Sequence, residues 1–228
     1  MRQSRHIFVT GGTGYIGRRV IPALLSRGHR VRAVTREASR EKLPAGCEPV
    51  VGNALDPETF ASRVGPTDTF LQLVGVSHPS PAKAAEFRAV DLASARASAK
   101  AAAAAGVRHF VYVSVAQPAP VMKAYVAARA EGEAAIRAAG LNATFVRPWY
   151  VLGPGHRWPY ALLPAYWLLS RFPPTAETSR RLFPLPLDRL VATLVRSIEN
   201  PATGIRIVES PEIRRTTLQN EGPRLMRN

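Results

Sequence analysis

The chain has 228 residues, which is enough for one domain with a sizeable core and a small appended lobe. It carries 31 lysines and arginines against 16 acidic residues, a formal net charge of +15. The arginines are scattered, without a dense basic run or interleaved aromatic residues, so nucleic acid is not indicated as the partner. The single cysteine, Cys47, excludes an internal disulfide, and an apolar strand follows the first residues without room for a signal peptide. Both points favour the cytoplasm, and no spacing typical of metal ligands occurs.

A glycine-rich segment joins the first predicted strand to the first predicted helix. Residues 7–9 form a short apolar run, Gly11, Gly14 and Gly17 follow, and a helical pattern then continues to Gly28. In a dinucleotide-binding turn, the first glycine permits the tight turn, the second admits the pyrophosphate, and the third lets helix and strand pack closely. The helix N-terminus then offers N–H groups to the phosphates. The segment therefore predicts a dinucleotide site.

The second predicted strand, residues 30–35, ends directly before Arg36. An acidic residue near this place would bond the ribose 2′-hydroxyl of NAD, whereas an arginine suits the 2′-phosphate of NADP. We therefore favour NADP(H) over NAD(H). The alternative is that Arg36 is one of many surface arginines. A short third strand is expected at residues 48–52.

Residues 69–75 predict a fourth strand that is buried on both faces. Its end, Val74 and Gly75, should lie near the cofactor ribose, because ligands bind beyond the carboxyl ends of strands in open parallel sheets. His78 follows in a loop rich in Pro and Ser, where it is either a proton donor or a solvated residue. Residues 82–105 predict a long alanine-rich helix.

Residues 108–114 predict the fifth strand, which ends at Ser114. After a proline-rich linker, Tyr125 opens a helix, and Arg129 follows four residues later. This spacing places both side chains on one helical face, where a permanent positive charge favours the phenolate. The alternative has Tyr125 as a packed aromatic residue and Arg129 in a salt bridge or as a ligand of the ribose.

The rest of the chain predicts a sixth strand at residues 142–147, a helix at 187–198 and a last strand at 204–208. The tract 158–169 is the most apolar part and is too short and too interrupted by proline to span a bilayer. Four roles fit it: a lid over an apolar substrate, a dimer surface, a shallow membrane contact between Arg157 and Arg171, or ordinary core packing.

Four segments resemble one family in the expected order. Residues 10–17 resemble the TGxxGxxG loop of short-chain dehydrogenase/reductase proteins, and more narrowly of their atypical NAD(P)H-binding branch, which includes NmrA-like proteins and relatives of the complex I accessory subunit. Residues 53–56 are similar to the family's adenine-side loop, 106–114 to its fifth strand, and 147–155 to its RPxxxxGPG stretch. The resemblance covers roughly residues 6–210.

The resemblance implies a single Rossmann domain over residues 1–228, a doubly wound parallel sheet of about seven strands. It implies a substrate lobe at residues 148–203, and residues 214–228 are expected to be a disordered tail. The helix at 82–105 often forms a dimer interface in this family, so a homodimer is expected. The cofactor-binding residues implied are Gly11, Thr13, Gly14, Tyr15, Ile16, Gly17, Arg36, Asn53, Ala54, Val74, Gly75 and Pro148.

The resemblance also implies the chemistry. Ser114 stands where the family keeps the serine that hydrogen-bonds the substrate carbonyl, and Tyr125 stands where its tyrosine transfers a proton. Arg129 departs from the family's lysine. The predicted function is an NADP(H)-dependent oxidoreductase acting on a small apolar carbonyl or quinone-like substrate. Two alternatives stay open: a non-catalytic redox sensor or assembly factor, and a nucleotide-sugar epimerase or dehydratase, for which the chain looks short.

Overall fold

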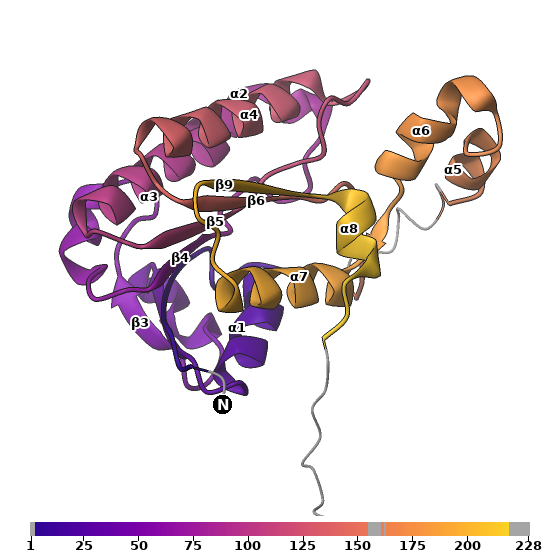
Figure 1. The fold of residues 1–228 in the computed structure, drawn as a ribbon. Helices are drawn as coiled ribbons and strands as arrows, with labels where there is room; N and C mark the ends of the chain where they lie inside the picture. Colours follow the sequence, from indigo (N-terminus) through magenta and orange to yellow (C-terminus); the bar gives the residue numbers. More distant parts are fainter. Residues whose placement is uncertain (1–2, 155–160, 162, 219–228) are drawn as a thin grey trace, which may run out of the picture.

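Seven parallel strands form the central sheet, in the spatial order β3-β2-β1-β4-β5-β6-β9 (Figure 1). The computed structural model describes residues 3–154, 161 and 163–218. The strands are β1 (His6–Thr10), β2 (Arg30–Thr35), β3 (Glu48–Val51), β4 (Thr69–Gln72), β5 (His109–Val113), β6 (Ala143–Arg147) and β9 (Ile205–Glu209). Because all neighbours run parallel, their carboxyl ends meet at one edge of the sheet. The predicted doubly wound Rossmann sheet is confirmed.

Helices cover both faces of this sheet, with α1 and α7 on one face and α3 and α4 on the other (Figure 1). Their bounds are α1 (Gly17–Leu25), α3 (Ala93–Ala104), α4 (Lys123–Ala138) and α7 (Leu187–Glu199). Short 3-10 turns occupy the loops after β2 and β3: η1 (Glu37–Lys42), η2 (Pro57–Thr59) and η3 (Ala61–Arg63).

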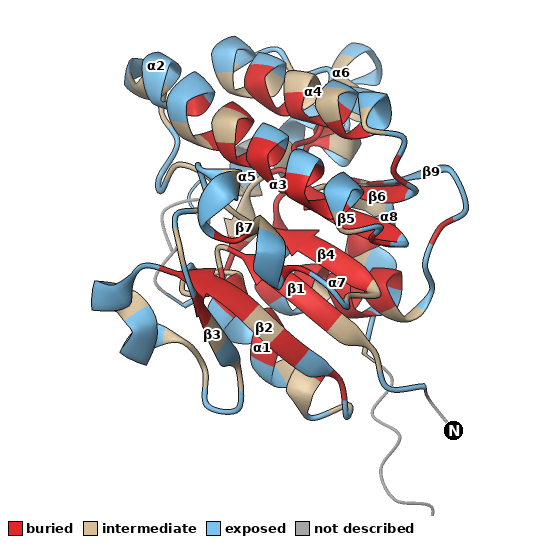
Figure 2. Ribbon diagram, turned by 90° about the vertical axis from the view of Figure 1, so that its left-hand side faces the viewer, coloured by how far each residue is buried: buried red, intermediate tan, exposed pale blue. Residues whose placement is uncertain are grey.

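Alternate side chains of each strand enter two hydrophobic cores, one on each face of the sheet. In β1, Ile7 and Val9 pack with α1 and α7, whereas Phe8 packs with the core beneath α3. Figure 2 shows the central strands β1, β4, β5 and β6 as almost continuously buried, whereas the edge strands β3 and β9 carry exposed residues. A strand that is covered on both faces is mostly apolar, which is why the central strands are visible in the sequence as largely apolar runs.

The helix expected over residues 82–105 is a succession of helical segments: η4 (Pro81–Lys83), α2 (Ala84–Glu86), η5 (Phe87–Leu92) and then α3. The segment η5 has π-helical hydrogen bonding, and such wide turns inside a helix are frequent at functional sites. Within η5, the side chain of Asp91 is fully buried.

A small lobe lies beyond the carboxyl edge of the sheet (orange in Figure 1). It consists of α5 (Leu163–Leu169), α6 (Pro173–Arg181) and a two-stranded sheet, β7 (Val151–Leu152) with β8 (Leu185–Pro186). Part of the predicted apolar tract, residues 158–160 and 162, lies outside the described residues, as does Arg157.

The described chain closes with α8 (Ser210–Arg215) and continues to Leu218, with Thr216 buried. Residues 219–228 of the expected tail lie outside the described residues. No helix in the described part of the chain is long and apolar enough to cross a bilayer.

Candidate cofactor and catalytic site

A cavity of about 630 Å³ lies beyond the carboxyl ends of the central strands. Its lining comes from the glycine loop (Gly11, Gly14 to Gly17), from the end of β4 and the loop after it (Leu73, Gly75 to Pro81), from the end of β5 (Val113 to Val115), from α4 with the residue before it (Met122, Tyr125, Arg129) and from residues 148–151. This size is typical of a ligand site, and the position is the one that open α/β sheets use for ligands.

The glycine loop cannot accept side chains at its critical positions. A Cβ atom at Gly17 would lie 2.5 Å from the carbonyl oxygens of Gly11 and Gly12. Gly11 has a φ of +83°, and a Cβ there would lie 2.8 Å from the carbonyl carbon of Leu73 in the next strand. The loop therefore leaves its bare main chain and the start of α1 facing the cavity, as a bound pyrophosphate requires.

The structure brings most of the predicted residues together around this cavity. The predicted residues that line it are Gly11, Gly14, Tyr15, Ile16, Gly17, Gly75, Pro148, Ser114, Tyr125 and Arg129. The remaining ones, Thr13, Arg36, Asn53, Ala54 and Val74, are not part of its lining. Arg36 and Asn53 are exposed directly after β2 and β3, at the same edge of the sheet as the glycine loop.

Arg129 is held beneath the cavity by a buried ion pair. Its Nη2 lies 2.6 Å from Oδ1 of Asp91, and its Nη1 donates to the carbonyl oxygen of Val113 at 2.8 Å. The other oxygen of Asp91 accepts a hydrogen bond from the Val76 amide at 3.0 Å. Burial raises the pKa of the Asp91 carboxyl, while Arg129 and the Val76 amide act in the opposite direction. A Cβ at Gly75 would overlap Nη2 of Arg129, so glycine is required there.

Tyr125 lies on the same face of α4 as Arg129 and lines the cavity. Its ring packs on Phe87 with a centroid distance of 5.0 Å, and the Arg129 guanidinium lies 5.3 Å from the ring centroid. Burial raises the pKa of the Tyr125 phenol, and the nearby guanidinium opposes this rise. The phenol is thus protonated at neutral pH and able to donate a proton.

Ser114 directly follows β5 at the cavity wall, and its hydroxyl donates a hydrogen bond to a buried carboxylate. Its Oγ donates to Oε1 of Glu133 at 2.7 Å. Glu133, on α4, also accepts hydrogen bonds from Gln117 Nε2 at 2.9 Å and from Arg147 Nη2 at 2.7 Å. Since a hydroxyl has a single hydrogen, Ser114 in this arrangement offers the cavity its lone pairs.

The backbone is strained at two places in the cavity wall. His78 has a φ of 52° and Met122 a φ of 57°, and they are the two non-glycine residues in the described chain with positive φ. Both line the cavity. His78 Nδ1 lies 2.9 Å from the Ser77 hydroxyl oxygen. Strained backbone of this kind concentrates at functional sites.

Two charged residues of the site, Asp91 and Glu133, were not predicted from the sequence. Glu133 carried a usable signal, because it follows Arg129 by four residues and so lies on the face of α4 that carries the predicted catalytic residues. Asp91 carried none, since its position depends on the π-helical turn.

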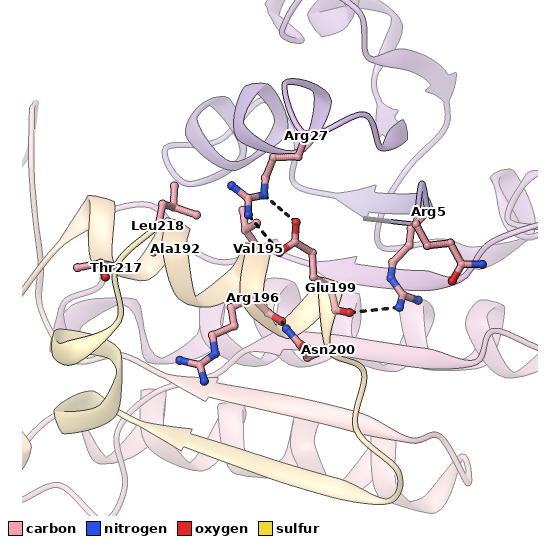
Figure 3. Close-up of a pocket in the computed structure, with 10 residues that line it drawn as sticks. Arg5, Arg27, Ala192, Val195, Arg196, Glu199, Asn200, Thr217 and Leu218 are labelled. Carbon is pink, nitrogen blue, oxygen red and sulfur yellow. Dashed lines mark hydrogen bonds and ion pairs between the residues drawn. The ribbon is translucent and has the colours of Figure 1, made fainter. Parts of the chain in front are cut away.

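A second cavity, of about 450 Å³, lies at the opposite edge of the sheet (Figure 3). Arg27 Nε lies 2.7 Å from Oε1 of Glu199, and Arg5 Nη2 donates to the Glu199 carbonyl oxygen at 3.2 Å. Arg5 directly precedes β1, whereas the glycine loop follows it, and five strand residues separate the two by about 16 Å. This cavity therefore lies apart from the dinucleotide site. In the part of the chain that the structure describes, no cluster of His, Cys, Asp and Glu is suited to a metal ion.

Comparison with known proteins identifies relatives that include reductases. A family model described as NAD(P)H-binding matches residues 11–158. The chain is 30% identical to a ceramide reductase from Caulobacter vibrioides, over 92% of this chain and 65% of that protein. It is also 30% identical to a 3-diazoavenalumate denitrifying reductase from a Streptomyces species, over 90% of this chain and 76% of that protein.

A third relative is 4-hydroxy-2-methyl-3-oxo-4-farnesyl-3,4-dihydroquinoline-1-oxide ketoreductase from Stigmatella aurantiaca, with 32% identity over 47% of this chain and 32% of that protein. The chain thus spans less than two thirds of the ceramide reductase and about a third of this ketoreductase.

Solved structures share the fold. The Bordetella bronchiseptica enzyme WbmH with bound NAD+ matches with a TM-score of 0.66 and 20% identity, over 89% of this chain and 75% of that one. A dTDP-glucose 4,6-dehydratase from Streptomyces venezuelae, DesIV, matches with a TM-score of 0.68 and 19% identity, with the same coverage of 89% and 75%. At these identities the likeness concerns the fold alone.

Proposed function

The chain belongs to the NAD(P)H-binding family of atypical short-chain dehydrogenase/reductase proteins, and on this basis we propose that it is an NADP(H)-dependent oxidoreductase acting on a small apolar carbonyl or quinone-like substrate. The observation that carries the proposal is that one and the same cavity is lined by the glycine loop and by Ser114, Tyr125 and Arg129. A dinucleotide held by the loop therefore shares its space with a proton-donating phenol.

The glycine loop fits a pyrophosphate because Gly11, Gly14 and Gly17 line the cavity without side chains, and a Cβ at Gly17 would meet the carbonyl oxygens of Gly11 and Gly12 and displace the turn. When bound, the nicotinamide supplies or accepts a hydride. Tyr125 holds the proton that balances hydride transfer to a carbonyl, and its raised pKa keeps the phenol protonated until the substrate oxygen gains charge. Arg129, fixed by Asp91, supplies a permanent positive charge near the phenolate that forms.

The preference for NADP(H) rests on Arg36. Its side chain is exposed directly after β2, where a ribose 2′-phosphate would be contacted, and a guanidinium binds phosphate in a fork geometry. We expect Arg36→Ala to weaken NADPH binding about tenfold, the effect of roughly 1.4 kcal/mol, and to leave NADH binding nearly unchanged. Arg40→Ala, another exposed arginine in η1, is the matched control. Equal losses for both nucleotides would remove the argument for NADP(H).

An apolar substrate is supported by the aromatic wall of the cavity. Trp149 and Tyr150 line it with ring centroids 5.3 Å apart, and Met122 and Val151 lie in the same lining. Two relatives are named for ceramide and for a farnesyl compound, which agrees with an apolar substrate. The names of these two relatives do not identify the substrate of this chain.

The test is NADPH oxidation measured with a panel of apolar carbonyl compounds and quinones. Tyr125→Phe should abolish turnover and leave the dissociation constant for NADPH unchanged, because the phenol oxygen contributes to proton transfer and not to the phosphate site. Tight NADPH binding without oxidation by any compound would refute the proposed activity.

A second candidate is a non-catalytic redox sensor or assembly factor. The specific observation that favours it is the engagement of both supporting groups, because Ser114 donates to Glu133 and Arg129 is paired with Asp91. In that case Tyr125→Phe would alter neither nucleotide affinity nor partner binding.

A further inference from the structure

The lobe beyond the sheet carries an unusual concentration of exposed apolar side chains. Trp167, Leu168, Leu169 and Phe172 have exposed fractions of 54%, 52%, 43% and 53%. These four lie within six consecutive residues, and we call them the α5 patch. They are four of the nine large apolar side chains that are exposed in the described part of the chain. Exposed clusters of this kind mark interaction surfaces.

Three residues of the α5 patch lie on α5, Phe172 directly precedes α6, and α5 is held in place by Tyr166. The Tyr166 hydroxyl accepts a hydrogen bond from Trp149 Nε1 at 2.8 Å, and the Tyr166 ring packs on Phe183 with a centroid distance of 5.9 Å. Trp149 in turn lines the proposed cofactor and substrate cavity. Because Tyr166 holds the helix to the cavity wall, its neighbours Trp167, Leu168 and Leu169 remain exposed.

Positive charge accompanies the patch at Arg171, whose guanidinium lies 3.9 Å from the centroid of the Trp167 ring. Arg180 and Arg181 end α6, and the Arg181 guanidinium donates a hydrogen bond to the Pro118 carbonyl oxygen. Glu177 is the one acidic residue from position 163 to 181, so this part of the lobe carries a net charge of +2. The whole chain carries +15. A tryptophan beside an arginine suits the boundary between lipid headgroups and acyl chains, and the surplus charge complements anionic lipid.

We propose that the α5 patch docks on the surface of a membrane that contains anionic lipid. The helix has seven residues, about 10 Å of length, so it lies in the interface and does not span the bilayer. Docking brings the wall of the proposed catalytic cavity near the acyl chains. An apolar substrate could then enter the cavity directly from the bilayer, which extends the proposed function. That path rests on the proposed function, whereas the docking itself does not.

The experiment measures binding of the purified full chain to sedimented vesicles of phosphatidylcholine alone and of phosphatidylcholine mixed with phosphatidylglycerol. We expect binding to the mixed vesicles, weakened by added salt, and little binding to phosphatidylcholine alone. Trp167→Ser combined with Phe172→Ser should weaken binding to the mixed vesicles at least ~10-fold. Arg171→Glu should also weaken binding to the mixed vesicles, and it should reduce the dependence of binding on lipid charge, whereas the apolar change leaves the attraction between charges in place.

The matched control is Ile205→Ser combined with Ile207→Ser, since these β9 side chains are exposed by 41% and 39% but lie outside the lobe. The control should bind vesicles as the unaltered chain does. Equal binding by the patch variant and the control would overturn the proposal, and so would the absence of binding to the mixed vesicles. A dimer that the patch variant converts to a monomer, without any vesicle binding, would show that a second copy covers the patch.

Two further measurements separate this proposal from the proposed function. Tyr125→Phe should keep vesicle binding, because its change lies inside the cavity. The patch variant should keep NADPH affinity, because the glycine loop is unaltered. Vesicle binding by a chain that never oxidises NADPH would support docking and refute only the activity.

Discussion

The buried ion pair between Asp91 and Arg129 gives the sharpest prediction about stability. Asp91→Ala leaves the Arg129 guanidinium buried without a carboxylate, with the Val113 carbonyl oxygen and the rings of Tyr112 and Tyr125 as its neighbours. The exposed side-chain fractions of Arg129 and Asp91 are 6% and 0%, so the guanidinium loses its carboxylate at a site with little access to water. Removing one partner from such a pair costs about 3–5 kcal/mol of unfolding free energy.

The assay is thermal and urea unfolding followed by circular dichroism. For a chain of this size, 1 kcal/mol corresponds to about 2–4 °C, so the melting temperature should fall by roughly 6–20 °C. Arg88→Ala is the matched control, because Arg88 pairs with Glu131 between the same two elements, η5 and α4, but has 63% of its side chain exposed. An exposed pair contributes about 0–1 kcal/mol.

A double variant tests the cause. Asp91→Leu combined with Arg129→Met removes both charges, so it should be more stable than Asp91→Ala, which leaves an unpaired charge. If Asp91→Ala loses no more stability than Arg88→Ala, the buried pair does not join η5 to α4 in the way we describe.

Three further predictions follow from single residues. Gly17→Ala should abolish dinucleotide binding in a fluorescence titration, because the added Cβ meets two loop carbonyl oxygens at 2.5 Å. The control is Gly28→Ala, where φ is +82° and the space for a Cβ is open. This control should lose only roughly 1–2 kcal/mol of stability and keep its affinity for the dinucleotide. Burial and the Arg206 charge lower the pKa of His109 to about 4. Between pH 6.5 and pH 4, His109 is therefore protonated in the unfolded chain and neutral in the folded chain. Stability should therefore decrease by about 3 kcal/mol as the pH falls through this window, and His109→Leu should flatten the dependence; an unchanged slope would contradict the assignment. Burial raises the pKa of Cys47 to about 12, so its alkylation at pH 8 should be far slower than that of a free thiol, and rapid alkylation would show that the thiol is accessible.

The doubly wound parallel sheet could be predicted because the relevant signals are local. The run at 7–9 is apolar throughout and the run at 69–75 is largely so, as is typical of strands covered on both faces. The glycine loop was equally visible, since Gly11 and Gly17 are required by backbone geometry. The order of these elements along the chain then leaves few alternative topologies.

The partners of the catalytic candidates could not be predicted in the same way. Asp91 lies in the π-helical turn η5, which places its carboxylate beside Arg129. No local sequence pattern predicts the extra residue of such a turn. The hydrogen bond from Ser114 to Glu133 joins a strand to a helix 19 residues later, and only packing decides it. The roles of Ser114 and Tyr125 and the preference for NADP(H) stay predictions.

The contact between Gly75 and the Arg129 guanidinium has a consequence for variation within the family. Three positions on three different elements share one small volume, since residue 75 can have no side chain while Asp91 and Arg129 remain paired. A change at one of these positions therefore alters what the other two can hold. A lysine at position 129 has no Nη2 atom to meet a side chain at position 75, so we expect relatives with that lysine to tolerate residues other than glycine at 75, and the three positions should covary.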